Sequence, residues 1–319
     1  MTQWCWCTTE GSTACAGAHS LCSYCVAFTT KDATEGVQSV ADYRLHLQQI
    51  FKLYKASGDR THHLKKMCDA LAQSQYLCLK HPISIRWLSL GKAVKAVKSV
   101  YPALALELEE EAQRNNLTAA VNLSCKCKMF AFVAMTYMLS DVIPITEKLN
   151  LTFQQEAVNL SDIQPVADSM KASLQCLLTT PGHNEQDFST TVTWDGGMFQ
   201  MVKLTYCDRQ PVFKQARTAF IEQLIQALTK RFLDDQLRIV SALANVLDRQ
   251  KYPPSNPPGL LDAYTTRDPT LLTRYYATTI NGPRAQNDFD QFKRILSGYG
   301  GDVALSSGIW QHDSWTSLC

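Results

Sequence analysis

The chain has 319 residues, of which 45% are hydrophobic, so it can bury the core of one large domain or of two medium ones. Its 31 basic and 29 acidic side chains give a net charge of +2, which excludes a general electrostatic attraction to nucleic acid. Any polyanion must therefore bind at a local patch.

The amino-terminal segment is rich in cysteine but has no secretory signal. The twelve cysteines of the chain are scattered rather than set at the spacings of a small disulfide framework, which favours reduced thiols. No basic segment followed by an apolar run is present at the start, so we do not expect secretion. Cys22 and Cys25 have the gap at which two thiolates share a tetrahedral zinc, and His19 is close in sequence. A zinc site and idle or buried thiols are both open interpretations.

Helical spacing of apolar residues predicts one helix over residues 40–54 and another over 94–108. The turn residues Ser57-Gly58-Asp59 end the first. The second finishes in an acidic run over residues 107–111, which we interpret as a solvated helix face; a site for a basic partner is the alternative.

An Arg86-Trp87 pair stands directly before the second helix. It suits either a buried Trp covered by the Arg stem or a grip on an unpaired nucleotide, with Arg on phosphate and Trp stacked on a base. Lys92, Lys95 and Lys98 follow three apart and so share one helix face. This basic stripe is either a DNA-binding surface or an ordinary solvated face.

Residues 129–145 are the most apolar stretch and predict a helix that bends or ends near Pro144. The stretch is at the short limit of a membrane span and contains Asp141, so a buried helix is favoured. Another helix is expected after residues 161–162.

One β-hairpin is predicted, with residues 191–194 and 198–202 flanking Asp195-Gly196-Gly197. Helical spacing then returns over residues 220–232 and 237–247, and the Pro-rich stretch 252–259 predicts a loop. Short helices are expected at residues 271–276 and 289–296.

Common enzyme signatures are missing from the sequence. It has no Gly-rich phosphate loop, no Gly-x-Ser-x-Gly and no His-Glu-x-x-His. A two-metal nuclease needs at least three converging carboxylates, and no predicted core strand carries an Asp.

Several segments together resemble the hAT superfamily of DNA transposases, and most closely its domesticated group of zinc finger protein 862-like proteins. Residues 85–90 match the Arg-Trp motif of that family, and residues 15–21 resemble its Cys-x-x-His-x-Leu segment with one extra residue. Residues 160–165 and 231–235 are similar to further segments. The resemblance implies a mainly α chain: the helical insertion domain of an RNase H-like fold, with one β-hairpin and an incomplete catalytic core.

The same resemblance implies that transposition is lost. The family uses two Asp and one Glu, and both Asp precede the Cys/His segment, whereas no Asp precedes Cys15 here. The last carboxylate position aligns with Asp288, so Cys15, His19 and Asp288 are vestigial family positions without a catalytic site. In family members the positions of Arg86 and Trp87 contact DNA near the cleavage site.

The expected organisation has a core remnant over residues 1–35, a helical region over 36–180, the hairpin with helices over 181–250, and a Pro-rich loop with short helices over 251–319. We expect a non-enzymatic protein or DNA interaction module, nuclear by resemblance and otherwise cytoplasmic. No membrane, small-molecule substrate or cofactor is expected. The alternatives are DNA binding by the basic helix face and a zinc-dependent amino-terminal module.

Overall fold

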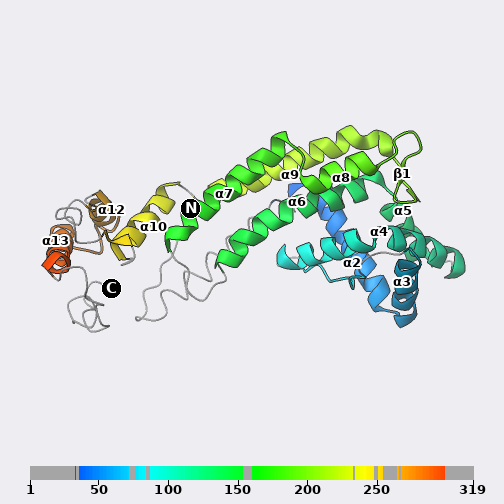
Figure 1. Ribbon diagram of the computed structural model, residues 1–319, viewed down its shortest axis with the longest axis horizontal. Coiled ribbons are helices and arrows are strands. Elements are labelled where there is room, and N and C mark those ends of the chain that lie inside the picture. Colours follow the sequence, from blue (N-terminus) through cyan, green and yellow to red (C-terminus); the bar gives the residue numbers. More distant parts are fainter. Residues whose placement is uncertain are drawn as a thin grey trace. The chain divides into compact units, whose positions relative to one another are not determined.

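The computed structural model describes residues 33, 36–71, 76–83, 87–115, 117–153, 160–232, 234–247, 251–253, 264–265 and 267–298. These residues are mainly helical and contain one two-stranded sheet (Figure 1). The prediction of a mainly α chain with one β-hairpin is therefore confirmed for them. The chain divides into two compact units, and the larger takes in Cys22–Thr152 and Asp168–Arg231. The smaller contains Phe153–Ala167 and Phe232–Cys319.

The first helices that the structure describes with their bounds in the larger unit are α2 (Gln38–Lys55), α3 (Gly58–Ala70), α4 (Trp87–Asn115) and α5 (Thr118–Cys127). The predicted break between the first two is confirmed at Ser57, whose side chain caps α3 by accepting a hydrogen bond from the backbone N–H of Arg60. The predicted apolar face of α4, from Val94 to Leu108, is fully buried. α2, α3 and α5 pack on α4, which is therefore the central helix of this part.

α6 (Phe130–Phe153) follows, and Pro144 does not end it. Its segment Phe130–Thr152 is long and apolar enough to cross a membrane: its most apolar window of 18 residues has a mean hydropathy of 1.2, but 67% of that window is buried against the rest of the structure. Burial of this extent is typical of a core helix, which is the interpretation that the sequence favoured.

Three further helices are α7 (Leu160–Thr179), α8 (His183–Thr191) and α9 (Gln210–Arg231). The sequence did not predict α8, and its cap explains why. Gly182 at the N-cap has no side chain, and Asp141 of α6 takes its place by accepting hydrogen bonds from the backbone N–H groups of Asn184 (3.0 Å) and Glu185 (2.9 Å). A carboxylate is favourable at this end of a helix dipole. The capping residue is 43 positions away in sequence, so no local pattern signals it.

The β-hairpin turns later than predicted. β1 (Met198–Phe199) pairs with β2 (Val202–Lys203), so the tight turn is Gln200-Met201 and the predicted turn at residues 195–197 is wrong for this pair. Both turn residues have positive φ, 46° and 67°, as a type I′ turn requires. Residues 195–197 instead turn the chain between Thr193 and Met198, which exchange backbone hydrogen bonds.

Phe199 anchors the hairpin to the helices. Its ring centroid lies 4.9 Å from that of Phe188 on α8, 5.5 Å from Tyr137 on α6 and 5.8 Å from Tyr101 on α4. Edge-to-face and tilted ring pairs of this kind add to the burial of apolar area. The hairpin is therefore held by side-chain packing and not only by its own short ladder.

The described helices of the smaller unit include α10 (Asp234–Leu247), α12 (Arg267–Tyr275) and α13 (Gly282–Gly298). Ile239, Ala242 and Leu272 form a core between α10 and α12. The ring of Tyr252 meets that of Phe292 on α13 edge-on at 5.9 Å. The helices predicted over residues 237–247, 271–276 and 289–296 are confirmed, but α12 begins four residues and α13 seven residues before the predicted start.

Replacing Gly182 with Ala tests the cap of α8. A Cβ at Gly182 would lie 2.3 Å from Cγ of Asp141, so the carboxylate must leave the helix end. We expect Gly182→Ala to lower the free energy of unfolding by about 1–3 kcal/mol in denaturant titrations, as overpacking does.

Gly58→Ala is the matched control, because a Cβ there meets nothing within 4 Å and the residue is helical. This change should be neutral or stabilise by up to about 1 kcal/mol. Equal effects of the two substitutions would contradict the cap.

Candidate functional site

The acidic end of α4 is divided between core and surface. Glu107 and Glu111 are each only 1% exposed, so the interpretation of the run as a solvated face is wrong for these two. Glu109 and Glu110 have side-chain exposures of 44% and 56%. Residues four apart share a helix face, and the buried pair continues the apolar face that ends at Leu108. The spacing of Glu107 and Glu111 along this face could have predicted their burial. The acidic composition of the run indicated a solvated face instead.

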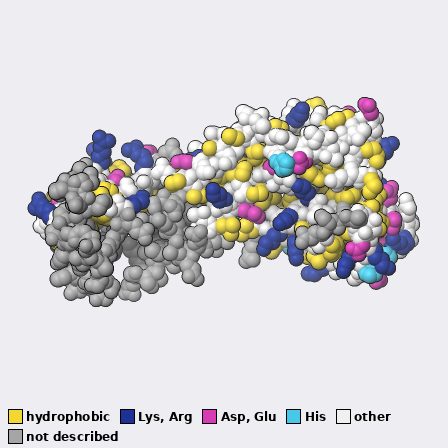
Figure 2. Space-filling model, in the orientation of Figure 1, with side chains coloured by type: hydrophobic (Ala, Val, Ile, Leu, Met, Phe, Trp, Pro, Cys, Tyr) yellow, Lys and Arg dark blue, Asp and Glu magenta, His cyan; other side chains and the backbone are white. Residues whose placement is uncertain are grey.

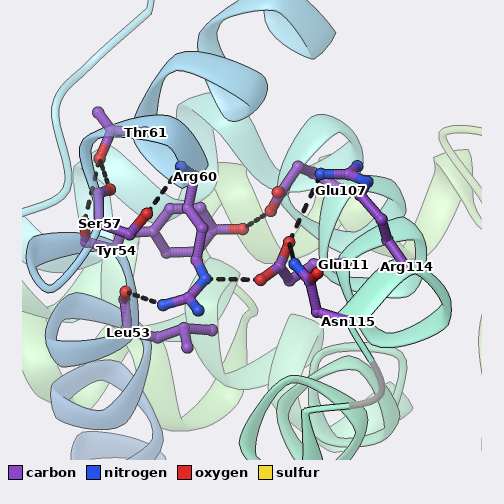
Figure 3. A network of polar contacts seen from close by, with 9 residues as sticks. All are labelled: Leu53, Tyr54, Ser57, Arg60, Thr61, Glu107, Glu111, Arg114 and Asn115. Atoms are coloured by element: carbon purple, nitrogen blue, oxygen red, sulfur yellow. Dashed lines mark hydrogen bonds and ion pairs between the residues drawn. The ribbon is translucent and has the colours of Figure 1, made fainter.

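Both buried carboxylates are bound by side chains from α2 and α3 (Figure 3). The hydroxyl of Tyr54, at the end of α2, donates a hydrogen bond to Glu107. Nε of Arg60, in the first turn of α3, lies 2.6 Å from Oε1 of Glu111. The other oxygen of Glu111 accepts a hydrogen bond from Nδ2 of Asn115 at 3.0 Å. The turn between α2 and α3 is thus joined to α4 at two neighbouring points.

The two carboxyl groups differ in their electrostatics. Burial raises the pKa of Glu107 above its ordinary value, although the hydrogen bond from Tyr54 opposes this shift. Oε1 of Glu107 is buried without a hydrogen-bond partner among the described residues, so the neutral acid is the less costly form there. Burial also acts to raise the pKa of Glu111, but the hydrogen bonds from Arg60 and Asn115 outweigh it and lower the pKa. Glu111 is therefore a stable anion.

A small pocket of about 150 Å³ lies beside this network. Tyr54, Thr61, Tyr76 and Cys78 are among its lining residues, whereas the buried glutamates are not. Burial raises the pKa of Tyr76 to about 12, so its hydroxyl stays protonated. The volume is below the range of roughly 300–1,000 Å³ that small-molecule sites occupy. The arrangement can thus support the helices, and it does not bring the glutamates to a ligand.

The Arg-Trp pair lies at the edge of what the structure describes. Arg86 is outside the described residues, and Trp87 is the first residue of α4, with its side chain not described. Both interpretations of this pair therefore stay predictions.

The basic stripe is divided by the fold. Lys92 and Lys95 are exposed on α4, whereas Lys98 is half-buried. Nζ of Lys98 donates a hydrogen bond to Asn184 and lies 4.9 Å from the ring centroid of Tyr137. Burial lowers the pKa of Lys98, although nearby Asp141 and Asp187 oppose this shift. Lys98 thus contacts α6 and α8, and two lysines of the stripe remain on the surface.

The positions that the hAT resemblance assigns to the Cys/His segment and to the last carboxylate are only partly described. Cys15, His19, Cys22 and Cys25 lie outside the described residues, so the structure does not bear on a zinc site there. Asp288 lies on α13, where its Oδ2 is 3.8 Å from Nε of Arg284. In the part of the chain that the structure describes, no group of three or more His, Cys, Asp and Glu residues is placed to hold a metal ion.

The hairpin and the segment after it expose large apolar side chains, and no pattern in the sequence indicated their exposure. The exposed residues here are Trp194 (44%), Met198 (37%), Met201 (63%), Tyr206 (54%) and Val212 (62%). Trp194 also packs on Phe130 and the guanidinium of Arg209 lies over the ring of Tyr206, so Met201 and Val212 are the most exposed of the set.

No protein family matches the sequence, and no solved structure matches the chain. The hAT resemblance consequently rests on its motif segments. Residues 85–90 lead into α4, residues 160–165 begin α7, and residues 231–235 join α9 to α10.

The opposite pKa shifts of the buried glutamates predict opposite pH effects. A raised folded-state pKa stabilises the fold below the ordinary value of 4.5 and loses this contribution as pH rises through the raised value. Glu107→Gln mimics the neutral acid, so its stability relative to wild type should improve from pH 4 to pH 8. A lowered pKa acts in the other sense. Glu111→Gln should cost about 1.5–3 kcal/mol at neutral pH and less as pH falls below 4.5.

These differences are measured by urea unfolding at several pH values. Glu110→Gln is the exposed control and should change stability by less than about 0.5 kcal/mol throughout. If both buried variants followed the same pH trend, the assigned protonation states would be wrong.

Proposed function

We propose that the chain is a non-enzymatic interaction module of hAT-transposase descent, nuclear like those relatives, and that DNA is one of its partners. Lys92 and Lys95 carry this proposal, because both are exposed on one face of α4 directly after the Arg86-Trp87 pair. Two cations on a rigid helix can contact neighbouring phosphates of a nucleic acid backbone. Lys98 is not part of this surface, since it contacts Asn184 and Tyr137.

The placement of the acidic groups supports a binding role over a cleaving one. Glu107 and Glu111 hold the helices together, and Asp288 is paired with Arg284. Strand cleavage by the family mechanism needs several carboxylates that converge on metal ions. Glu107 and Glu111 are buried between helices, and Asp288 forms a partly exposed ion pair with Arg284 on α13.

Protein binding is the second candidate function. The exposed apolar residues of the hairpin segment favour it, with Met201 and Val212 more than 60% exposed. Trp194 and Tyr206 of the same segment are also exposed, and aromatic residues and Met are enriched at protein interfaces.

DNA binding and the absence of cleavage can be tested together. We expect duplex and hairpin DNA to bind with an affinity that falls steeply between about 50 and 200 mM salt. Lys92→Glu with Lys95→Glu should weaken binding and lower the salt slope by roughly two, because two phosphate contacts are lost. Wild type and Asp288→Ala should both leave the DNA uncut in magnesium or manganese.

Lys65→Glu with Lys66→Glu is the matched control, since it makes the same charge change at exposed positions of α3. It should retain the wild-type salt slope. Equal losses of DNA affinity in the two double variants, or an affinity that does not change with salt concentration, would overturn the DNA role. Cleavage that disappears in Asp288→Ala would overturn the non-enzymatic role.

A further inference from the structure

A pocket of about 420 Å³ lies in the smaller unit, formed by α10, α12 and the start of α7. Three arginines line it: Arg238 on α10, and Arg267 and Arg274 two turns apart on α12. Residues at this separation lie on the same face of a helix. Figure 2 shows several Lys and Arg side chains on the surface over α10 to α13. The pocket thus gathers basic groups from separate elements at one concave place.

The three guanidinium groups have no carboxylate partner within the described ranges. Asp268 also lines the pocket, but its carboxylate accepts a hydrogen bond from Nδ2 of Asn245 at 2.9 Å. Arginine stays charged at any relevant pH, so three positive charges and one negative charge leave the lining with a net charge of +2. The three arginines are solvent-exposed, so their mutual repulsion is screened, and the concave lining presents a positive potential to an anion.

The pocket is also lined by neutral polar side chains and by one apolar side chain. The hydroxyl of Ser241 and the side-chain amide of Gln164 both face the pocket and can donate hydrogen bonds. Leu271, which is partly buried against the core of α10 and α12, gives one wall an apolar surface. The volume lies within the range of roughly 300–1,000 Å³ that small ligands fill, so an organic group fits beside an anion.

We propose that this pocket binds a small phosphate monoester through its doubly charged phosphoryl group. The planar forks of arginine match the oxygens of phosphate in pairs, which gives the strongest class of charged hydrogen bond. The two negative charges of a phosphate monoester balance the net charge of +2 in the lining. A phosphodiester carries one negative charge and would leave a net charge of +1 there. The site is separate from Lys92 and Lys95 of α4, so it does not depend on the DNA-binding proposal.

Calorimetric titration of the full chain tests this proposal, with phenyl phosphate as the monoester probe and dimethyl phosphate as the diester probe. Phenyl phosphate should bind one molecule per chain. Arg274→Gln and Arg238→Gln should each raise its Kd about tenfold or more, because a charged hydrogen-bond pair is lost. Dimethyl phosphate should bind at least about tenfold more weakly than phenyl phosphate, because it carries half the charge.

Arg294→Gln is the matched control, since this residue is exposed on α13 in the same unit and does not line the pocket. It should leave the Kd for phenyl phosphate within about twofold of wild type. The proposal is overturned if phenyl phosphate gives no binding, if the pocket variants and Arg294→Gln behave alike, or if dimethyl phosphate binds as tightly as the monoester. Loss of DNA binding in the α4 variants with retained phenyl phosphate binding would show that the two sites are independent.

Discussion

The larger unit depends on two glutamates of α4 that are buried and must therefore be neutralised. An unpaired carboxylate in a protein interior costs several kcal/mol, which is a large part of the roughly 5–15 kcal/mol that stabilises a whole domain. Arg60 supplies a charge to Glu111, and Tyr54 supplies a hydrogen bond to Glu107. Arg60 and Tyr54 both lie near the turn between α2 and α3. Their contacts therefore lower the free-energy cost of burying the two carboxyl groups and also fix where that turn meets α4.

The cap of α8 follows the same rule. Asp141 of α6 satisfies backbone groups of α8 that Gly182 cannot, and Phe199 then packs the hairpin between α4, α6 and α8. Polar groups inside this unit are thus used between helices, while Lys92, Lys95 and the apolar residues of the hairpin remain outside.

Local patterns predicted most of the helices, because the apolar spacing that the sequence shows is the spacing that burial requires. They failed where a partner is distant in sequence. α8 needs Asp141, and the burial of Glu107 and Glu111 needs Tyr54 and Arg60, so composition alone made the acidic end of α4 look solvated. The hairpin turn at Gln200-Met201 carries no Gly or Asn to mark it. Of the predicted site residues, Lys92 and Lys95 lie on the surface and Lys98 does not, a difference set by packing against α6 and α8.

A double-mutant cycle between Arg60 and Glu111 measures most directly whether the α2–α3 turn is fixed by the buried carboxylates. The free energy of unfolding is compared for wild type, Arg60→Ala, Glu111→Gln and the double variant at neutral pH. We predict a coupling energy of at least about 1.5 kcal/mol, because Arg60→Ala removes the positive charge that faces the buried carboxylate of Glu111, and Glu111→Gln removes that carboxylate. Effects that add within about 0.5 kcal/mol would contradict it, since they would mean that the two side chains contribute independently.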